Sequence, residues 1–109
     1  MFIANVYTLA YNKIVKLSYE WNENKNRANF EKHGVWFEEA KTVWADSLAT
    51  EFYDDSHSTN KEDRFIRIGF STKDRLLLVV FCERNANVIR IVSARKATPK
   101  EKKDYEEGI

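Results

Sequence analysis

The chain has 109 residues and a formal net charge of +1 at pH 7, from 18 lysines and arginines against 17 aspartates and glutamates. A hydrophobic content of 43% with 14% aromatic residues excludes a disordered tail, and three glycines with one proline exclude collagen-like and low-complexity classes. The length predicts one domain, and a single cysteine, Cys82, with two histidines excludes an internal disulfide and leaves too few soft ligands for structural zinc.

The N-terminal segment Met1–Leu17 lacks the features of a secretory signal, because it has neither a basic start nor a small-residue cleavage site. The longest apolar run of the chain, Leu76–Cys82, is far shorter than the roughly 20 residues that cross a bilayer. We therefore expect a protein of the reducing cytoplasm.

The first half of the chain predicts one strand and two helices. Lys16–Trp21 has the composition of a short strand. Asn22 is a suitable N-cap for a helix over Glu23–His33, which Gly34 is suited to end. A second helix is predicted over Phe37–Ala45, because its apolar residues recur at helical spacing and form one stripe for a core.

The second half of the chain predicts a set of strands. An acidic loop, Asp54–Asp63, follows the first of them, and turns are predicted at Thr72–Asp74 and Asn85–Asn87. The last three strands are expected to form an antiparallel meander. The predicted fold class is therefore α+β, an antiparallel sheet with the N-terminal helices packed on it and a short C-terminal helix. The predicted strands are Leu48–Tyr53, Arg64–Ser71, Arg75–Glu83 and Val88–Ala94.

The C-terminal helix begins with the clearest local signal in the chain. Thr98 and Glu101 form a capping-box pattern, with Pro99 at the first helical position. Tyr105 is the only large apolar residue of this helix, and its lysines and glutamates oppose the macrodipole. We therefore expect the helix to dock weakly, and its deletion to cost little stability.

Charge is distributed unevenly along the chain. Residues 1–60 carry six basic and nine acidic side chains, whereas residues 61–109 carry twelve basic and eight acidic ones. From Arg84 to Lys100 there are five basic residues and no acidic one. Such a stripe attracts anions even on a nearly neutral protein, and phosphate is the anion that we expect.

This stripe and its border contain groups that can cleave RNA without a metal. A base takes the 2′-hydroxyl proton, an acid protonates the 5′-oxygen, and cations stabilise the phosphorane. Glu83 and Arg84 end one predicted strand, across a turn from Arg90 and Arg95 on the next. Strict alternation places Arg90 and Arg95 on opposite faces of the sheet unless the strand bulges. The alternative is that these arginines are strand-flanking charges paired with acids such as Glu83.

The histidines, tryptophans and cysteine have structural interpretations beside functional ones. His33 ends the first predicted helix, where the macrodipole favours a cation, and its alternative role is that of a general base. His57 lies in the acidic loop, where we expect it to be solvent-exposed and inert. The tryptophans are expected in the core or at an interface, and Cys82 as a small buried hydrophobe.

Three separated blocks of the sequence stand in a characteristic order: Tyr19–Lys25 with Asn29–Val35 and Phe37–Ala40, then Arg64–Gly69, then Ile89–Thr98. Together they resemble the BrnT-type toxins, at compatible spacings over about Leu17 to Tyr105. Two features depart from the family pattern. Met1–Lys16 precedes the usual start, and Trp36 replaces the usual polar cap before the second helix.

The resemblance implies a single RelE-like toxin domain over residues 1–109, with residues 1–16 as an N-terminal extension. It implies a metal-independent endoribonuclease without a cofactor, which cleaves RNA and halts translation and growth. The implied partner is a ribbon-helix-helix antitoxin, in a heterotetramer of two toxins and two antitoxins that contacts operator DNA only through the antitoxin. The alternatives are a non-catalytic binding module of the same fold and an unrelated RNA-binding domain.

The resemblance also implies roles for individual residues. Glu83 is the implied base, and the arginines of the stripe are the implied cations at the phosphate. A lysine and a histidine of the first helix are further acid or base candidates, and no metal ligand is implied. The implied catalytic residues are Glu83, Arg84, Arg90, Arg95, His33 and Lys25, and the implied RNA-binding residues are Arg64, Arg67, Lys96, Lys32 and Ser93.

Overall fold

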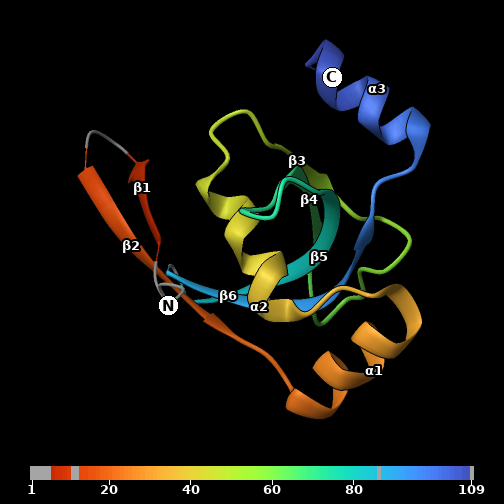
Figure 1. Ribbon diagram of the computed structural model, residues 1–109. Coiled ribbons are helices and arrows are strands. Elements are labelled where there is room, and N and C mark those ends of the chain that lie inside the picture. The colour runs from red at the N-terminus through yellow and green to blue at the C-terminus, as the bar shows by residue number, and fades with distance from the viewer. Residues whose placement is uncertain (1–5, 11–12, 86, 109) are drawn as a thin grey trace.

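A computed structural model describes residues 6–10, 13–85 and 87–108 of the chain (Figure 1). Within these ranges six strands form one sheet in the order β1-β2-β6-β5-β4-β3. The strands are β1 (Val6–Ala10), β2 (Lys13–Glu20), β3 (Thr50–Tyr53), β4 (Phe65–Phe70), β5 (Leu76–Asn85) and β6 (Val88–Lys96). The helices are α1 (Glu23–His33), α2 (Phe37–Ala40), the 3₁₀ helix η1 (Lys41–Ala45) and α3 (Pro99–Glu107).

The sheet is mixed, and the prediction of a wholly antiparallel sheet was wrong in one strand pair. Strands β3 to β6 pair antiparallel, as the predicted meander requires. β2, however, runs parallel to β6, with Ser18–Glu20 opposite Val88–Arg90. Parallel strands need a long connection between them, and the whole segment from α1 to β5 supplies it here. Local sequence patterns reveal a strand but not the direction of a partner so distant in the chain.

The N-terminal residues form a hairpin at the edge of the sheet. β1 pairs antiparallel with β2 from Val6↔Leu17 to Ala10↔Lys13. Of the predicted extension, residues 1–16, this hairpin includes 6–10 and 13–16, while residues 1–5 and 11–12 lie outside the described residues. The predicted turn at 85–87 likewise includes residue 86, which lies outside them.

The predicted limits of the first helix are confirmed, together with both of its caps. The Asn22 side chain accepts a hydrogen bond from the Lys25 backbone N–H at 3.0 Å. Gly34 ends α1 in the left-handed region, at φ 70°, which favours glycine because it has no Cβ. The second predicted helix divides into α2 and η1, and Trp36 makes no side-chain cap at its start.

Two apolar clusters cover the two faces of the sheet. The larger packs against α2 and η1 and includes Phe37, Val43 and Phe81; we call this side the helical face. The smaller lies on the opposite side, which we call the open face, and is formed by Ile68, Leu76, Leu78 and Val80 with Ile66, Val92, Ala97 and Tyr105 against it. β5 therefore has buried side chains on both faces.

A buried asparagine attaches α1 to the part of β6 that β2 does not reach. The Asn29 amide nitrogen donates to the carbonyl oxygens of Ala94 and Val35, at 2.8 and 2.9 Å. Its oxygen accepts the Ala94 backbone N–H at 3.1 Å. The amide thus pairs Ala94 as a neighbouring strand would, and it positions the end of α1 beside β6.

Replacing Asn29 by alanine is expected to lower the free energy of unfolding by about 2–4 kcal/mol, because it leaves the buried Ala94 N–H and C=O groups without partners. Urea denaturation monitored by tryptophan fluorescence measures the change. Asn24→Ala, on the exposed side of the same helix, is the matched control and should shift stability by less than about 0.5 kcal/mol. Equal losses in both variants would contradict this role of Asn29.

α3 stands at the periphery of the fold, and none of its residues is buried (Figure 1). Its predicted capping box is confirmed, with Glu101 N–H donating to Thr98 Oγ1 at 3.2 Å and Thr98 N–H donating to Glu101 Oε1 at 2.8 Å. Tyr105 donates to Asp46 Oδ2 at 2.6 Å and meets Phe70 edge to face. α3 is thus held by Tyr105, through this hydrogen bond and ring contact, and by the ion pair of Glu101 described below; the small cost of deleting the helix stays a prediction.

Candidate active site

A bulge in β6 places Arg90 and Arg95 on the same face of the sheet. Ile91 lies opposite Phe81, but Ser93, not Val92, lies opposite the preceding residue Val80. This extra residue reverses the alternation of all side chains after it. Arg90 is opposite Cys82 and Arg95 is opposite Leu78, and both partners belong to the open face of β5.

A cavity of about 460 Å³ lies over this face. Its apolar lining is formed by Phe52, Ile66, Leu78, Val80 and Ala94, and the other lining residues are polar or charged. Convergent polar groups over an apolar floor are typical of a ligand site. The cavity brings together four predicted site residues from three segments, His33, Arg64, Ser93 and Arg95.

Arg95 is held at the wall of this cavity by α3. Its guanidinium donates to both carboxylate oxygens of Glu101, at 2.9 and 2.8 Å. The hydrogen bond to Glu101 raises the pKa of Arg95 and that from Arg95 lowers the pKa of Glu101, so both groups stay charged. A phosphate must therefore compete with Glu101 for the guanidinium.

A second, smaller cavity of about 140 Å³ is lined by four cations, Lys25, Arg64, Arg84 and Arg90. Arg90 pairs with Glu20 at 2.8 Å, and Arg64 pairs with Glu62 at 3.0 Å. Arg84 lies between the two acids, 3.8 Å from Glu20 and 3.6 Å from Glu62. Four cations share two carboxylates, so the cluster retains excess positive charge. Arg64 lines both cavities, and the larger one is lined by two arginines and by two carboxylates, Asp54 and Glu101.

Glu83, the implied base, lies apart from Arg90 and Arg95. It is opposite Ile89, on the helical face, and lines a cavity with Arg67 and Glu51. The reason is the alternation of a strand, which points Glu83 and Arg84 to opposite faces. Glu83 and Arg84 line a common cavity only near the end of β5.

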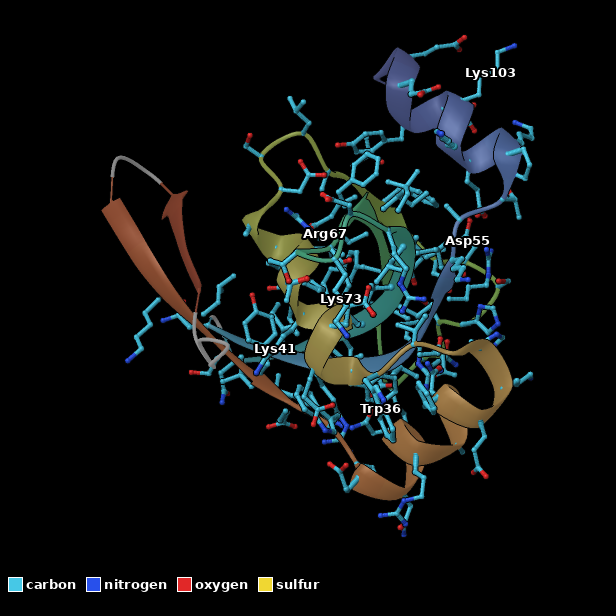
Figure 2. All side chains as sticks on the ribbon, in the orientation of Figure 1. Trp36, Lys41, Asp55, Arg67, Lys73 and Lys103 are labelled. Carbon is cyan, nitrogen blue, oxygen red and sulfur yellow. The ribbon has the colours of Figure 1, made fainter. Side chains whose placement is uncertain are left out.

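Three implied RNA-binding residues also lie outside both cavities. Figure 2 shows Arg67 beside η1, where it donates to the carbonyl oxygens of Val43 and Asp46 and to Glu51, at 3.2, 3.1 and 2.6 Å. These contacts connect η1 and β3 to β4, and each of the three guanidinium nitrogens already makes a hydrogen bond within the protein. Lys32 and Lys96 are exposed on α1 and at the end of β6.

His57, expected to be inert, is hydrogen-bonded to a buried carboxylate. Its side chain is 62% exposed, as expected, but Nδ1 lies 2.8 Å from Oδ2 of Asp54, whose side chain is 5% exposed. The ring also lines the larger cavity, with the predicted residues named above. The only local signal for this pair is the spacing of an aspartate and a histidine three residues apart, which is common in loops.

Cys82 is buried, as predicted, and burial raises the pKa of its thiol. Within the described ranges, no three His, Cys, Asp or Glu side chains are grouped so that they could hold a metal ion. None of the helices described here is both long and apolar enough to span a bilayer.

Comparison with known proteins gives a family match and a structural likeness. A family model described as "Ribonuclease toxin, BrnT, of type II toxin-antitoxin system" matches residues 21–101. The 1.1 Å crystal structure of the Brucella abortus ribonuclease toxin BrnT is similar to this chain with a TM-score of 0.57 and 23% sequence identity, over 75% of this chain and 97% of that one. Among curated proteins, none matches. The likeness to the crystal structure shows the fold, and the β1–β2 hairpin precedes the region that the family model covers.

Proposed function

Because this chain belongs to the BrnT family of ribonuclease toxins of type II toxin–antitoxin systems, we propose that it arrests growth as a metal-independent endoribonuclease that cleaves RNA and so stops translation. The observation that carries the proposal is the common face of Arg64, Arg90 and Arg95, beside His33 and Ser93. The fold is proposed to be RelE-like, in one domain that includes the N-terminal hairpin. Its place of action is the cytoplasm, where cellular RNA is.

The proposed site binds the RNA backbone along the open face. Guanidinium groups contact two phosphate oxygens at once and stay charged at every physiological pH. Arg95, in the larger cavity, is placed to stabilise the charge that develops on the phosphorane, and the Ser93 hydroxyl can donate a further hydrogen bond. The cluster around Arg84 and Arg90 holds an adjacent phosphate.

The acid and base of the proposed reaction come from the groups that line these cavities. His33, at the wall of the larger cavity, and Lys25, in the smaller one, are candidates for the proton transfers. Glu83, the implied base, lies on the other face of the sheet, and we therefore do not assign it to this step. Lys32 and Lys96 are exposed beside the site and contribute only long-range attraction for RNA.

The proposed partner is a ribbon-helix-helix antitoxin, in a complex of two toxins and two antitoxins that contacts operator DNA through the antitoxin. The family description supports an antitoxin in general, since it names a type II system. Trp36 is 36% exposed and stacks on Phe30, with ring centroids 4.2 Å apart, at the start of α2 (Figure 2). An exposed aromatic pair of this kind is a suitable contact for a protein partner.

A non-catalytic binding module is the second candidate function. It is favoured by one observation: Arg64, Arg84, Arg90 and Arg95 each pair with a glutamate in the free protein. In that case the arginines hold the fold and an interface together, and RNA is not cleaved.

Expression in a bacterial host without the antitoxin tests both candidates. Growth and the integrity of total RNA are followed together, and the purified protein is assayed on RNA with and without EDTA. Growth arrest with RNA cleavage that persists in EDTA, relieved by co-expression of an adjacent antitoxin gene, is the expected result. Normal growth and intact RNA from a folded protein would support the binding module instead.

A further inference from the structure

The loop between β3 and β4 has a defined conformation. Asp54 N–H donates to the Arg64 carbonyl oxygen at 2.8 Å, and Ser58 N–H donates to the Asp54 carbonyl oxygen at 3.1 Å. The Ser58 hydroxyl accepts a hydrogen bond from the Arg64 backbone N–H at 2.9 Å, and the Thr59 N–H donates to the backbone carbonyl oxygen of Glu62 at 2.9 Å. These bonds fix the backbone on both sides of His57, so its ring is presented from a structured loop.

The carboxylate of Asp54 fixes the orientation and the tautomer of His57. Asp54 Oδ2 lies 2.8 Å from Nδ1, and its Oδ1 accepts a hydrogen bond from the Ser56 hydroxyl at 2.9 Å. Ser56 Oγ also lies 2.9 Å from Nδ1, and because its own proton is donated to Asp54 it can only accept from the ring. An ionised carboxylate only accepts hydrogen bonds, so the proton of the neutral imidazole stays on Nδ1. Nε2 is then the basic nitrogen, and the same carboxylate stabilises the imidazolium that forms when Nε2 takes a proton.

Both histidines of the chain line the same cavity of about 460 Å³. His33 comes from the last turn of α1, and His57 comes from the loop after β3. Between these segments lies the surface of β6 that carries Ser93 and Arg95, and Arg64 lines the cavity from the start of β4. A phosphate bound in this cavity by the arginines would lie in a space that both histidines line.

We propose that His57, oriented by Asp54, is the general base of RNA cleavage and that His33 is the general acid. This inference rests on the proposed function. His57 Nε2 takes the proton of the 2′-hydroxyl, and the 2′-oxygen forms its bond to phosphorus. The bond from phosphorus to the 5′-oxygen breaks, and that oxygen takes the proton of the His33 imidazolium. The products are a 2′,3′-cyclic phosphate and a 5′-hydroxyl, and proton exchange with water restores both rings.

Five further charged or titratable groups decide the pH behaviour of this site. Those that line the cavity around His57 are Asp54, Arg64, Arg95, Glu101 and His33. One general base and one general acid act in the proposed step. The dependence of kcat/KM on pH should then be bell-shaped, with its acid limb set by the base.

His57→Ala and His57→Gln are compared with the parent on a mixed-sequence RNA of about 20 nucleotides, in single-turnover assays over a range of pH. Loss of a general base typically costs about 100-fold or more in rate, which is the expected fall in both variants. The Kd for the same RNA with 2′-O-methyl groups, which cannot react, should change by less than about threefold. The acid limb of the pH profile should disappear, and mass spectrometry of the parent's products should show 2′,3′-cyclic phosphate ends.

Asp54→Asn tests the positioning role and Asp55→Ala is the matched control. Asp54→Asn should lower the rate by about tenfold or more and change Kd little, since it removes the charge that stabilises the imidazolium. Asp55 is an exposed carboxylate of the same loop (Figure 2), and Asp55→Ala should cleave at the parent rate.

The two ways in which the proposal can fail are distinguishable. If the parent cleaves RNA and both folded His57 variants cleave at the same rate, the assignment of His57 is wrong while the proposed function stands. If the parent leaves RNA intact, the proposed function fails and this inference fails with it. Folding of each variant is checked by its thermal unfolding, and since His57 is a surface side chain both variants should unfold within a few degrees of the parent.

Discussion

Replacing Arg95 by alanine is expected to abolish growth arrest and to lower RNA cleavage by at least about 100-fold, while antitoxin binding stays largely intact. Removal of one preorganised donor to the charge of a transition state typically costs 10²–10³-fold, or about 3–4 kcal/mol. The proposed antitoxin contact, the exposed pair of Trp36 and Phe30, does not include Arg95, so this interface should lose little. Growth curves, single-turnover cleavage rates and co-purification of the antitoxin measure the three effects.

A second variant separates the proposed role of Arg95 at the phosphate from its role in docking α3. Glu101→Gln removes the negative charge that Arg95 binds in the free protein. If Arg95 acts on the phosphate, Glu101→Gln should retain or raise the affinity for RNA, because the competing carboxylate is gone. If Arg95 serves only to hold α3, both variants should lose activity alike, and the assignment would be wrong. Lys102→Ala, an exposed change on α3, controls for loss of positive charge.

Replacing Glu39 by alanine is expected to cost about 3–5 kcal/mol of folding stability. Its carboxylate is 4% exposed, is paired with the guanidinium of Arg75 and accepts the Ser71 hydroxyl hydrogen bond at 2.7 Å. The Arg75 guanidinium also donates to the Gly34 carbonyl oxygen, so Glu39 links the end of α1 to the start of β5. Removing one partner of a buried pair leaves the other charge without compensation. Urea denaturation near pH 7 measures the loss.

The same carboxylate should make stability depend on pH. Burial alone would raise the pKa of Glu39, but the hydrogen bonds from Arg75 and Ser71 lower it below its ordinary 4.5. Since the folded state has the lower pKa, the stabilisation is present above pH 4.5 and is lost as the pH falls below it. The Glu39→Ala variant should lose less stability than the parent over this range. Glu31→Ala, an exposed change on α1, should follow the parent, and an identical acid response in all three proteins would contradict the assignment.

Features that depend on neighbouring residues were predictable from the sequence. The caps of α1 and α3 form between residues at most four apart, so Asn22, Gly34 and Thr98 indicate the helix limits directly. The strands of the meander follow from alternation and turn residues in the same way. These elements account for most of the sheet and for the positions of α1 and α3 along the chain.

Features that depend on distant pairing were not predictable. The parallel partner of β2 lies about 70 residues further along the chain, at Val88–Arg90. Asn29 has a side chain that could bind a ligand, but in the structure its amide group is hydrogen-bonded to the backbone of Ala94. His57 lies in a loop with no periodic pattern, and only the burial of Asp54 shows that its ring is held.

Because of the bulge in β6, the site depends on the number of residues between Arg90 and Arg95. Arg90 and Arg95 are an odd number of positions apart, and they share a face only because one additional residue lies between them. A lineage that lost this residue would keep both arginines and lose their common orientation. The common orientation of the two arginines therefore depends on their separation along the chain as well as on their presence. If one residue between the two arginines were deleted, a sequence alignment would still show both arginines, but their side chains would lie on opposite faces of the sheet.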